Sequence, residues 1–115
     1  MTEYRRAKRR QVPHVVEVVD TMTEQVVGRI GNISETGMLL VTSHPGCDDA
    51  LYQLRFKLPG NNGESWSIDV GAHQLWSDLT RPPSVYWTGF RFIDVGNEDG
   101  EHLRHWIAQP GGKFV

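Results

Sequence analysis

The sequence predicts a small antiparallel β-barrel or sandwich that carries a single helix at its C-terminal end. Three observations lead to this fold class: many short β-prone runs, turn residues between them, and helical periodicity in only one late stretch. A small chain with several short strands has exposed sheet edges, and closing the sheet on itself removes them.

Six runs rich in β-branched and aromatic residues are the strand candidates. Gly, Pro, Asn and Asp lie between them, in segments such as HPGCDD, PGNNGE and DLTRPPS. In the last run, Phe90 and Phe92 share one face and Arg91 takes the other, so we expect one buried and one exposed face. In chain order, the expected strands are His14–Asp20, Val26–Ile33, Gly37–Ser43, Tyr52–Leu58, Ser65–Ser77 and Val85–Val95.

The stretch NEDGEHLRHWIAQ, residues 97–109, has the pattern of an amphipathic helix. One of its Asn or Asp residues can cap the N-terminus, and Pro110 with Gly111 ends the pattern. Leu103, Trp106 and Ile107 fall on one helical stripe. We expect this stripe to pack on the sheet and close one side of it.

Length and composition fit one compact domain. A chain of 115 residues leaves little room for a second domain, and 38% hydrophobic residues can build a core. No apolar run approaches the roughly 20 residues that span a bilayer, and the basic start lacks the apolar segment of a secretory signal. We therefore expect a cytoplasmic protein without membrane insertion. Cys47, the lone cysteine, can form no internal disulfide.

Positive charge is concentrated at the N-terminus. The first ten residues hold five basic and one acidic side chain, whereas the rest of the chain holds seven basic and thirteen acidic ones. We expect residues 1–13 to be a flexible basic arm and residues 14–115 to be the barrel with its helix. Such an arm can bind an anion or simply be solvated, and the acidic body argues against DNA as a partner.

Motifs typical of catalysis are missing from the sequence. It contains no GxSxG, GxxxxGK or HExxH pattern. His102 and His105 are three residues apart on the expected helix, but no cluster of further metal ligands is near them. Asp48 and Asp49 fit a solvated turn. We therefore expect neither an enzyme nor a metal site.

The tryptophans allow two interpretations. Exposed indole rings can stack on nucleic-acid bases, whereas strand and helix positions favour core filling for most of the four. The four residues are Trp66, Trp76, Trp87 and Trp106.

The segment NISETG, residues 32–37, packs polar and small residues into one connection between two expected strands. The Asn32 amide can donate and accept, the Ser34 hydroxyl suits a phosphate oxygen, and Gly37 permits close approach of a ligand or a positive φ. Ordinary β-turns use the same residue types, so this segment alone does not separate a site from a turn.

Two motifs occur in order: Arg6–Arg10 reads RxxxR, and Asn32–Gly37 reads [D/N]xSxxG. Together with the WSDL segment at Trp76, the TGFRFIDV strand and the closing helix, they resemble a PilZ domain over nearly the whole chain. The resemblance implies a six-stranded antiparallel β-barrel with a C-terminal helix. It also implies a non-enzymatic bacterial domain whose ligand is the second messenger cyclic di-guanosine monophosphate, c-di-GMP.

The resemblance further implies which residues contact c-di-GMP. A guanidinium can bond bidentately to guanine O6 and N7 or to phosphate, and it can stack on a purine. Arg6 and Arg10 are the preferred pair, because the family pattern often carries one more arginine just before the motif, and Arg5 fills that place. Arg5 and Arg9 have the same spacing, so they remain the alternative pair. Asn32 is expected to read a guanine edge, Ser34 to contact phosphate or base, and Gly37 to allow close packing. The expected site residues are Arg5, Arg6, Arg9, Arg10, Asn32, Ser34 and Gly37.

These features together predict a stand-alone receptor or adaptor. We expect the arm to become ordered over the barrel when c-di-GMP binds, which creates a surface for an unidentified partner protein. Two alternatives remain: a barrel that binds single-stranded nucleic acid, and a PilZ-like scaffold for protein contacts without nucleotide binding.

Overall fold

The computed structural model describes residues 7–60, 63–80 and 85–115. These residues form seven strands and one helix. The elements are β1 (Arg10–Gln11), β2 (Glu17–Asp20), β3 (Gln25–Ile33), β4 (Gly37–Thr42), β5 (Leu51–Pro59), β6 (Ser65–Leu79), β7 (Tyr86–Val95) and α1 (Asn97–Ala108).

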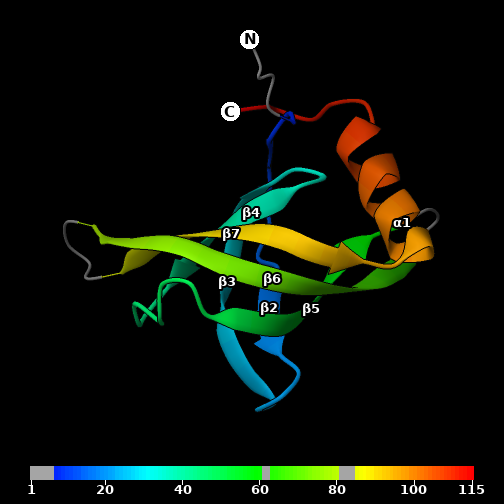
Figure 1. Ribbon diagram of the computed structural model, residues 1–115. Helices are drawn as coiled ribbons and strands as arrows, with labels where there is room; N and C mark the ends of the chain where they lie inside the picture. Colours follow the sequence, from blue (N-terminus) through cyan, green and yellow to red (C-terminus); the bar gives the residue numbers. More distant parts are fainter. Residues whose placement is uncertain (1–6, 61–62, 81–84) are drawn as a thin grey trace, which may run out of the picture.

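Strands β2 to β7 form a closed antiparallel barrel (Figure 1). The order around the sheet is β3-β2-β5-β6-β7-β4, and pairing of β4 with β3 closes it. The expected six-stranded barrel with a C-terminal helix is confirmed, and each of the six expected strands overlaps an observed one. The two-residue strand β1 was not expected, and it pairs with the end of β3.

The barrel core follows from the alternation of side chains along each strand. Strand β5 shows it most regularly, because Leu54, Phe56 and Leu58 are at most 1% exposed while Arg55 and Lys57 between them are exposed. Successive strand residues point to opposite faces, so one strand supplies both the core and the surface.

Helix α1 lies across one end of the barrel (Figure 1). Its expected stripe of Leu103, Trp106 and Ile107 is buried in the core cluster. The expected Asn or Asp cap is wrong, because the N-cap residue is Gly96 and no side chain caps the helix. Asp99 lies inside the first turn instead, where its carboxylate accepts a hydrogen bond of 3.0 Å from the backbone N–H of Asp69.

Core filling is wrong for most of the tryptophans. Trp106 is 3% exposed, but Trp76 and Trp87 are 41% and 40% exposed on the outer barrel wall. A register shift between Gln74 and Trp76 interrupts the alternation of β6 and turns Trp76 outward. The fourth, Trp66, is half-buried and stacks on a histidine of α1.

The remaining polar candidates stay at the surface or pack on the helix. His102 stacks on Trp66 with ring centroids 4.3 Å apart, and His105 meets the same ring edge-on. Cys47 is exposed, and Asp49 lies 3.0 Å from a ring nitrogen of a histidine on β6. Within the described ranges no group of three potential metal ligands occurs. None of the described helical residues forms a segment long and apolar enough to cross a membrane.

Candidate functional site

Strand β1 continues the sheet beyond the closed barrel. Arg10 pairs with Ile33 and Gln11 pairs with Asn32, so β1 lies against the end of β3 that carries the second motif. The register therefore brings the two motif segments side by side, although more than 20 residues separate them in the sequence.

The C-terminal tail, residues 109–115, lies along the other edge of β1. The Gln11 N–H donates to the carbonyl of Lys113 at 2.8 Å, and the Val115 N–H donates to the carbonyl of Arg9 at 2.9 Å. Strand β1 is thus held between β3 and the tail.

Arg9 and Asn32 are in direct contact. A terminal guanidinium nitrogen of Arg9 donates to Asn32 Oδ1 at 3.2 Å. Asn32 is 8% exposed, and its amide NH₂ group has two further donors. This pair combines a cation with an amide donor, which suits the O6 and N7 acceptors of a guanine or a phosphate oxygen.

Arg10 turns to the opposite side of β1, as the alternation of strand side chains requires. Its Nη1 donates to the backbone carbonyl oxygens of Trp106 at 2.7 Å and Gln109 at 2.9 Å. Its guanidinium carbon lies 4.5 Å from the centroid of the Trp106 ring. Arg10 therefore contacts the end of α1 and points away from Asn32.

The turn between β3 and β4 is held by its own residues. Ser34 is 1% exposed, and its Oγ accepts hydrogen bonds from the N–H groups of Thr36 at 3.1 Å and Gly37 at 3.2 Å. Gly37 does not have a positive φ; a Cβ at this position would collide with the carbonyl oxygen of Phe90 on β7. The absence of a side chain at Gly37 therefore lets β4 pack closely against β7.

The outer barrel wall next to Asn32 is partly aromatic. The registers align Asn32, Leu39, Gly89 and Trp76 across β3, β4, β7 and β6. Gly89 leaves space for the indole of Trp76, since a Cβ there would lie 2.6 Å from a ring carbon. Arg91 is exposed two residues further along β7, on the same face as Gly89. An indole surface and a cation thus accompany Asn32 on this wall.

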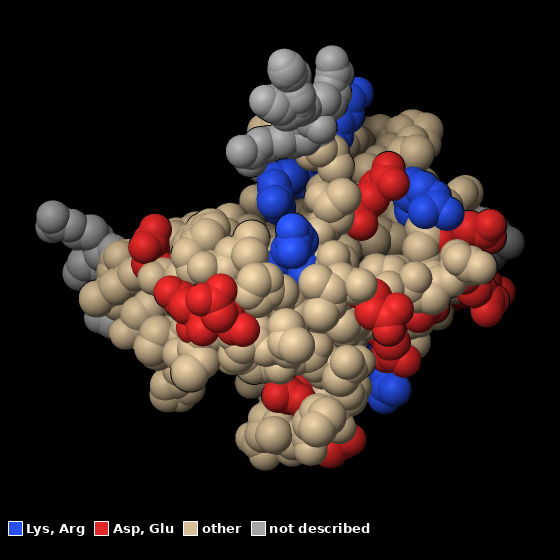
Figure 2. Space-filling model, viewed as in Figure 1, with Lys and Arg blue, Asp and Glu red and all other residues tan. Residues whose placement is uncertain are grey.

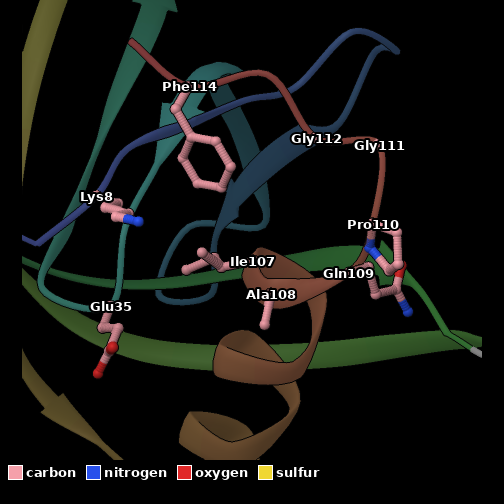
Figure 3. Close-up of a pocket in the computed structure, with 9 residues that line it drawn as sticks. All are labelled: Lys8, Glu35, Ile107, Ala108, Gln109, Pro110, Gly111, Gly112 and Phe114. Atoms are coloured by element: carbon pink, nitrogen blue, oxygen red, sulfur yellow. The ribbon is translucent and has the colours of Figure 1, made fainter.

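Charge is unevenly distributed over the molecule. In the face shown in Figure 2, several basic side chains lie in the upper and central part with an acidic group beside them, and acidic side chains dominate the rest of the face, where a few basic side chains also occur. A cavity of about 480 Å³ opens between Lys8, the turn and the end of α1 with its tail (Figure 3). Lys8, Glu35, Ile107 and Phe114 line it together with residues 108–112.

Comparison with known families identifies the chain. The family model of the PilZ domain matches residues 3–109, which is nearly the whole sequence. The chain belongs to the PilZ family. The sequence-based assignment to this family is confirmed.

Two solved structures resemble this PilZ domain in fold. The inhibitor of motility MotI/DgrA of Bacillus subtilis has a TM-score of 0.76 and 16% sequence identity, covering 92% of this chain and 50% of its own. The present chain thus spans half the length of that protein. The PilZ domain of YcgR from Escherichia coli, determined with c-di-GMP, has a TM-score of 0.67 and 14% identity, covering 91% of this chain and 89% of its own. No curated protein matched in the sequence search.

The expected site residues of this PilZ domain have different surroundings. Arg9 and Asn32 meet, Ser34 and Gly37 shape the adjoining turn, and Arg10 packs on α1. Arg5 and Arg6 lie outside the described residues. Sequence reasoning missed Trp76 and Trp87 as surface groups. The alternation that puts Arg91 outward also puts Trp87 outward, whereas no sequence pattern marked the bulge that turns Trp76.

Proposed function

We propose that this PilZ domain is a receptor that binds c-di-GMP beside Arg9 and Asn32 and passes the signal to a partner protein. The contact that carries this proposal is the 3.2 Å hydrogen bond from Arg9 to Asn32 Oδ1, because it joins the arginine motif to the NxSxxG motif. The match to the PilZ family and the fold shared with a c-di-GMP-bound PilZ domain support the choice of ligand.

The chemistry of the surroundings supports the same ligand. A cyclic dinucleotide is a compact dianion with two purine faces, and it needs cations, donors for the guanine acceptors and a flat apolar surface. Arg9 and Arg91 supply the cations, Asn32 the donors and Trp76 the indole surface. We propose that one ligand contacts these groups along the outer barrel wall.

Between the two possible arginine pairs, the contacts favour Arg5 and Arg9. Arg9 lies at Asn32, whereas the guanidinium of Arg10 donates to backbone carbonyls of α1. In an RxxxR motif, the residue four before Arg9 is Arg5. We therefore propose Arg5 and Arg9 as the ligand-contacting pair, in place of Arg6 and Arg10.

The signal is proposed to pass through the N-terminal arm. Its polar residues before β1 cannot bury enough apolar surface to offset their ordering entropy, unless a counter-anion binds them. Binding of c-di-GMP then orders the arm over the barrel wall and forms a new surface for the partner. Amide hydrogen exchange measures this directly: residues 5–8 should gain protection with ligand, and equal protection without ligand would contradict the relay.

Isothermal titration calorimetry on the purified domain tests the receptor assignment itself. We expect saturable binding of c-di-GMP, no comparable binding of GTP, and an affinity that falls only modestly between two salt concentrations. Absence of heat and of any change in tryptophan fluorescence at high micromolar c-di-GMP, with a folded protein, would overturn the assignment and favour a protein-interaction scaffold.

One observation favours the nucleic-acid alternative enough to include it in the same experiment. Trp76 and Trp87 expose indole rings on the outer wall, and exposed aromatics can stack on the bases of a single strand. A single-stranded oligonucleotide is therefore titrated in parallel. Tighter binding of the oligonucleotide than of c-di-GMP, with a steep dependence on salt, would support that alternative.

A further inference from the structure

The surroundings of Arg10 differ from those of a free ligand-binding arginine. Its Nη1 donates to backbone carbonyl oxygens at the C-terminal end of α1: those of Trp106 and Ile107 in the last turn, at 2.7 and 3.3 Å, and that of the C-cap residue Gln109 at 2.9 Å. The last carbonyls of a helix have no partner inside the helix and form the negative end of its dipole. A guanidinium at this place therefore caps α1 by charge and by hydrogen bonds.

Packing also holds the same guanidinium. The Trp106 ring centroid lies 4.5 Å away. Gly112 of the tail is also close, since a Cβ built on it would come within 2.6 Å of the guanidinium carbon and of Nε. Arg10 Nε is buried, and it has no hydrogen-bond partner among the described residues. The side chain is thus enclosed by α1 and the tail, where it has little freedom to reach a ligand on the barrel wall.

Because Arg9 precedes Arg10 in the chain, fixing the Arg10 side chain also fixes the direction of the Arg9 side chain. Strand β1 has only two residues, so few backbone hydrogen bonds fix its register on β3. Since neighbouring strand side chains point to opposite faces, a guanidinium fixed on the α1 side directs the preceding side chain toward Asn32. The orientation of Arg9 therefore depends on a contact on the opposite side of the strand.

We propose that Arg10 is a positioning residue for the ligand site: its guanidinium binds the carbonyls at the end of α1 and thereby holds Arg9 in the orientation that contacts Asn32. This inference rests on the proposed function, because it assigns c-di-GMP binding to Arg9. By the reciprocity of linkage, c-di-GMP bound at Arg9 stabilises the contact of β1 with α1 and the tail to the same extent that this contact strengthens binding.

Gly112 supplies a variant that separates positioning from direct contact. Gly112→Ala leaves every charge in place, but its Cβ displaces the Arg10 guanidinium from the end of α1. Arg10→Ala removes the guanidinium altogether. Lys113→Ala is the control, because it removes one positive charge as Arg10→Ala does. The contact of Lys113 with β1 is made by its backbone carbonyl, which accepts from the Gln11 N–H and is kept in the variant.

The affinities for c-di-GMP are measured by calorimetry well below the unfolding temperature, with folding checked by circular dichroism. We expect Arg10→Ala and Gly112→Ala each to weaken binding by at least about 5-fold, the lower end of typical coupling between sites. The double variant should lose little more than Arg10→Ala alone, and Lys113→Ala should bind as the wild type does. A residue that only stabilises the fold would lower the unfolding temperature without changing the affinity of the folded protein.

Two results would overturn the inference. If Arg10→Ala weakens binding and Gly112→Ala does not, Arg10 contacts the ligand directly, as the sequence suggested. If both variants bind like the wild type, the contact of Arg10 with the end of α1 has no role in binding.

A second measurement does not depend on the ligand. Amide exchange at Gln11 and Val12, whose N–H groups donate to Lys113 and Gly31, should accelerate in Arg10→Ala and Gly112→Ala but not in Lys113→Ala. If the wild type fails to bind c-di-GMP but shows this exchange pattern, the proposed function is wrong and the contact of Arg10 with α1 still fixes β1. Unchanged exchange in the variants would show that this contact does not fix β1.

Discussion

The turn at residues 34–37 and strand β1 lie side by side, but their motif residues make different kinds of contact. In the turn, the Ser34 hydroxyl bonds to backbone groups of the same turn, and Gly37 packs on the neighbouring strand. At the start of β1, Arg9 just before the strand contacts Asn32 on β3, and Arg10 within it contacts the end of α1. The turn residues determine local shape, whereas the arginines connect distant segments.

The two kinds of contact predict different effects of substitutions on stability and on binding. Loss of a turn residue changes the backbone on which the site is built, so we expect stability to fall first. Arg9 lies outside the strands of the closed barrel, so its substitution should lower binding more than stability.

Gly37→Ala should have the largest effect. Its Cβ would collide with a backbone carbonyl oxygen of β7, which cannot move aside as a flexible side chain can. We expect a loss of stability of about 3 kcal/mol, the upper part of the usual range for overpacking. Urea unfolding measures it.

Gly100→Ala is the control for this glycine substitution. It lies in α1, where a Cβ meets only the end of Arg104 at 3.4 Å and a methyl of Val95 at 3.8 Å. Helix propensity predicts a gain of about 0.5 to 1 kcal/mol. Equal stability of the two variants would contradict the close packing of β4 on β7.

Arg9→Lys should weaken c-di-GMP binding by about 1 to 3 kcal/mol, the scale of a bidentate contact to a guanine edge. Lysine keeps the charge but loses the planar fork, so the unfolding midpoint should stay within error of the wild type. Asn32→Ala should weaken binding similarly, and Lys8→Ala should change it much less. Calorimetry at two salt concentrations checks the ranking; equal losses for every removed charge would indicate a non-specific anion site.

Ser34→Ala should cost about 1 kcal/mol of stability, because the N–H groups of Thr36 and Gly37 lose their acceptor in a largely buried turn. Glu35→Ala, on the exposed side of the same turn, should stay within about 0.5 kcal/mol. Below the unfolding transition, we expect Ser34→Ala to retain most of its affinity. A strong loss of affinity in a fully folded variant would instead show the direct phosphate or base contact expected from the sequence.

Arg55→Ala should have the smallest effect. Arg55 donates to Asp69 at 2.7 Å on the exposed face of β5 and β6, and this hydrogen bond raises the pKa of Arg55 above its ordinary value. The guanidinium is already charged at neutral pH, so its raised pKa adds no pH dependence there, and exposed ion pairs are screened by salt. Thermal unfolding at low and high salt should barely distinguish the variant from the wild type.

The sequence predicted the barrel well because its signals are local. Alternation, turn residues and the helical stripe each depend on neighbouring residues, and Leu54, Phe56, Trp106 and Ile107 are buried as such patterns require. The six strands and the helix could therefore be located without a structure.

The site was harder to predict because its contacts are long-range. The spacing of RxxxR fits two registers, and only the strand pairing of β1 with β3 shows that Arg9 meets Asn32 while Arg10 meets α1. Trp76 shows the same limit: a single extra residue in β6 reverses the face of every side chain after it, and no local residue type marked that position.

The ribbon formed by β1 and the tail also has a mechanical consequence. Its strands are antiparallel, and Arg9 and Val115 lie at the same end of it. A force that separates these ends loads the hydrogen bonds one after another: first Val115 to Arg9, then Gln11 to Lys113, and finally the guanidinium of Arg10 on the last turn of α1. We therefore expect this ribbon to open bond by bond from Arg9 and Val115, while the closed barrel keeps its strands paired.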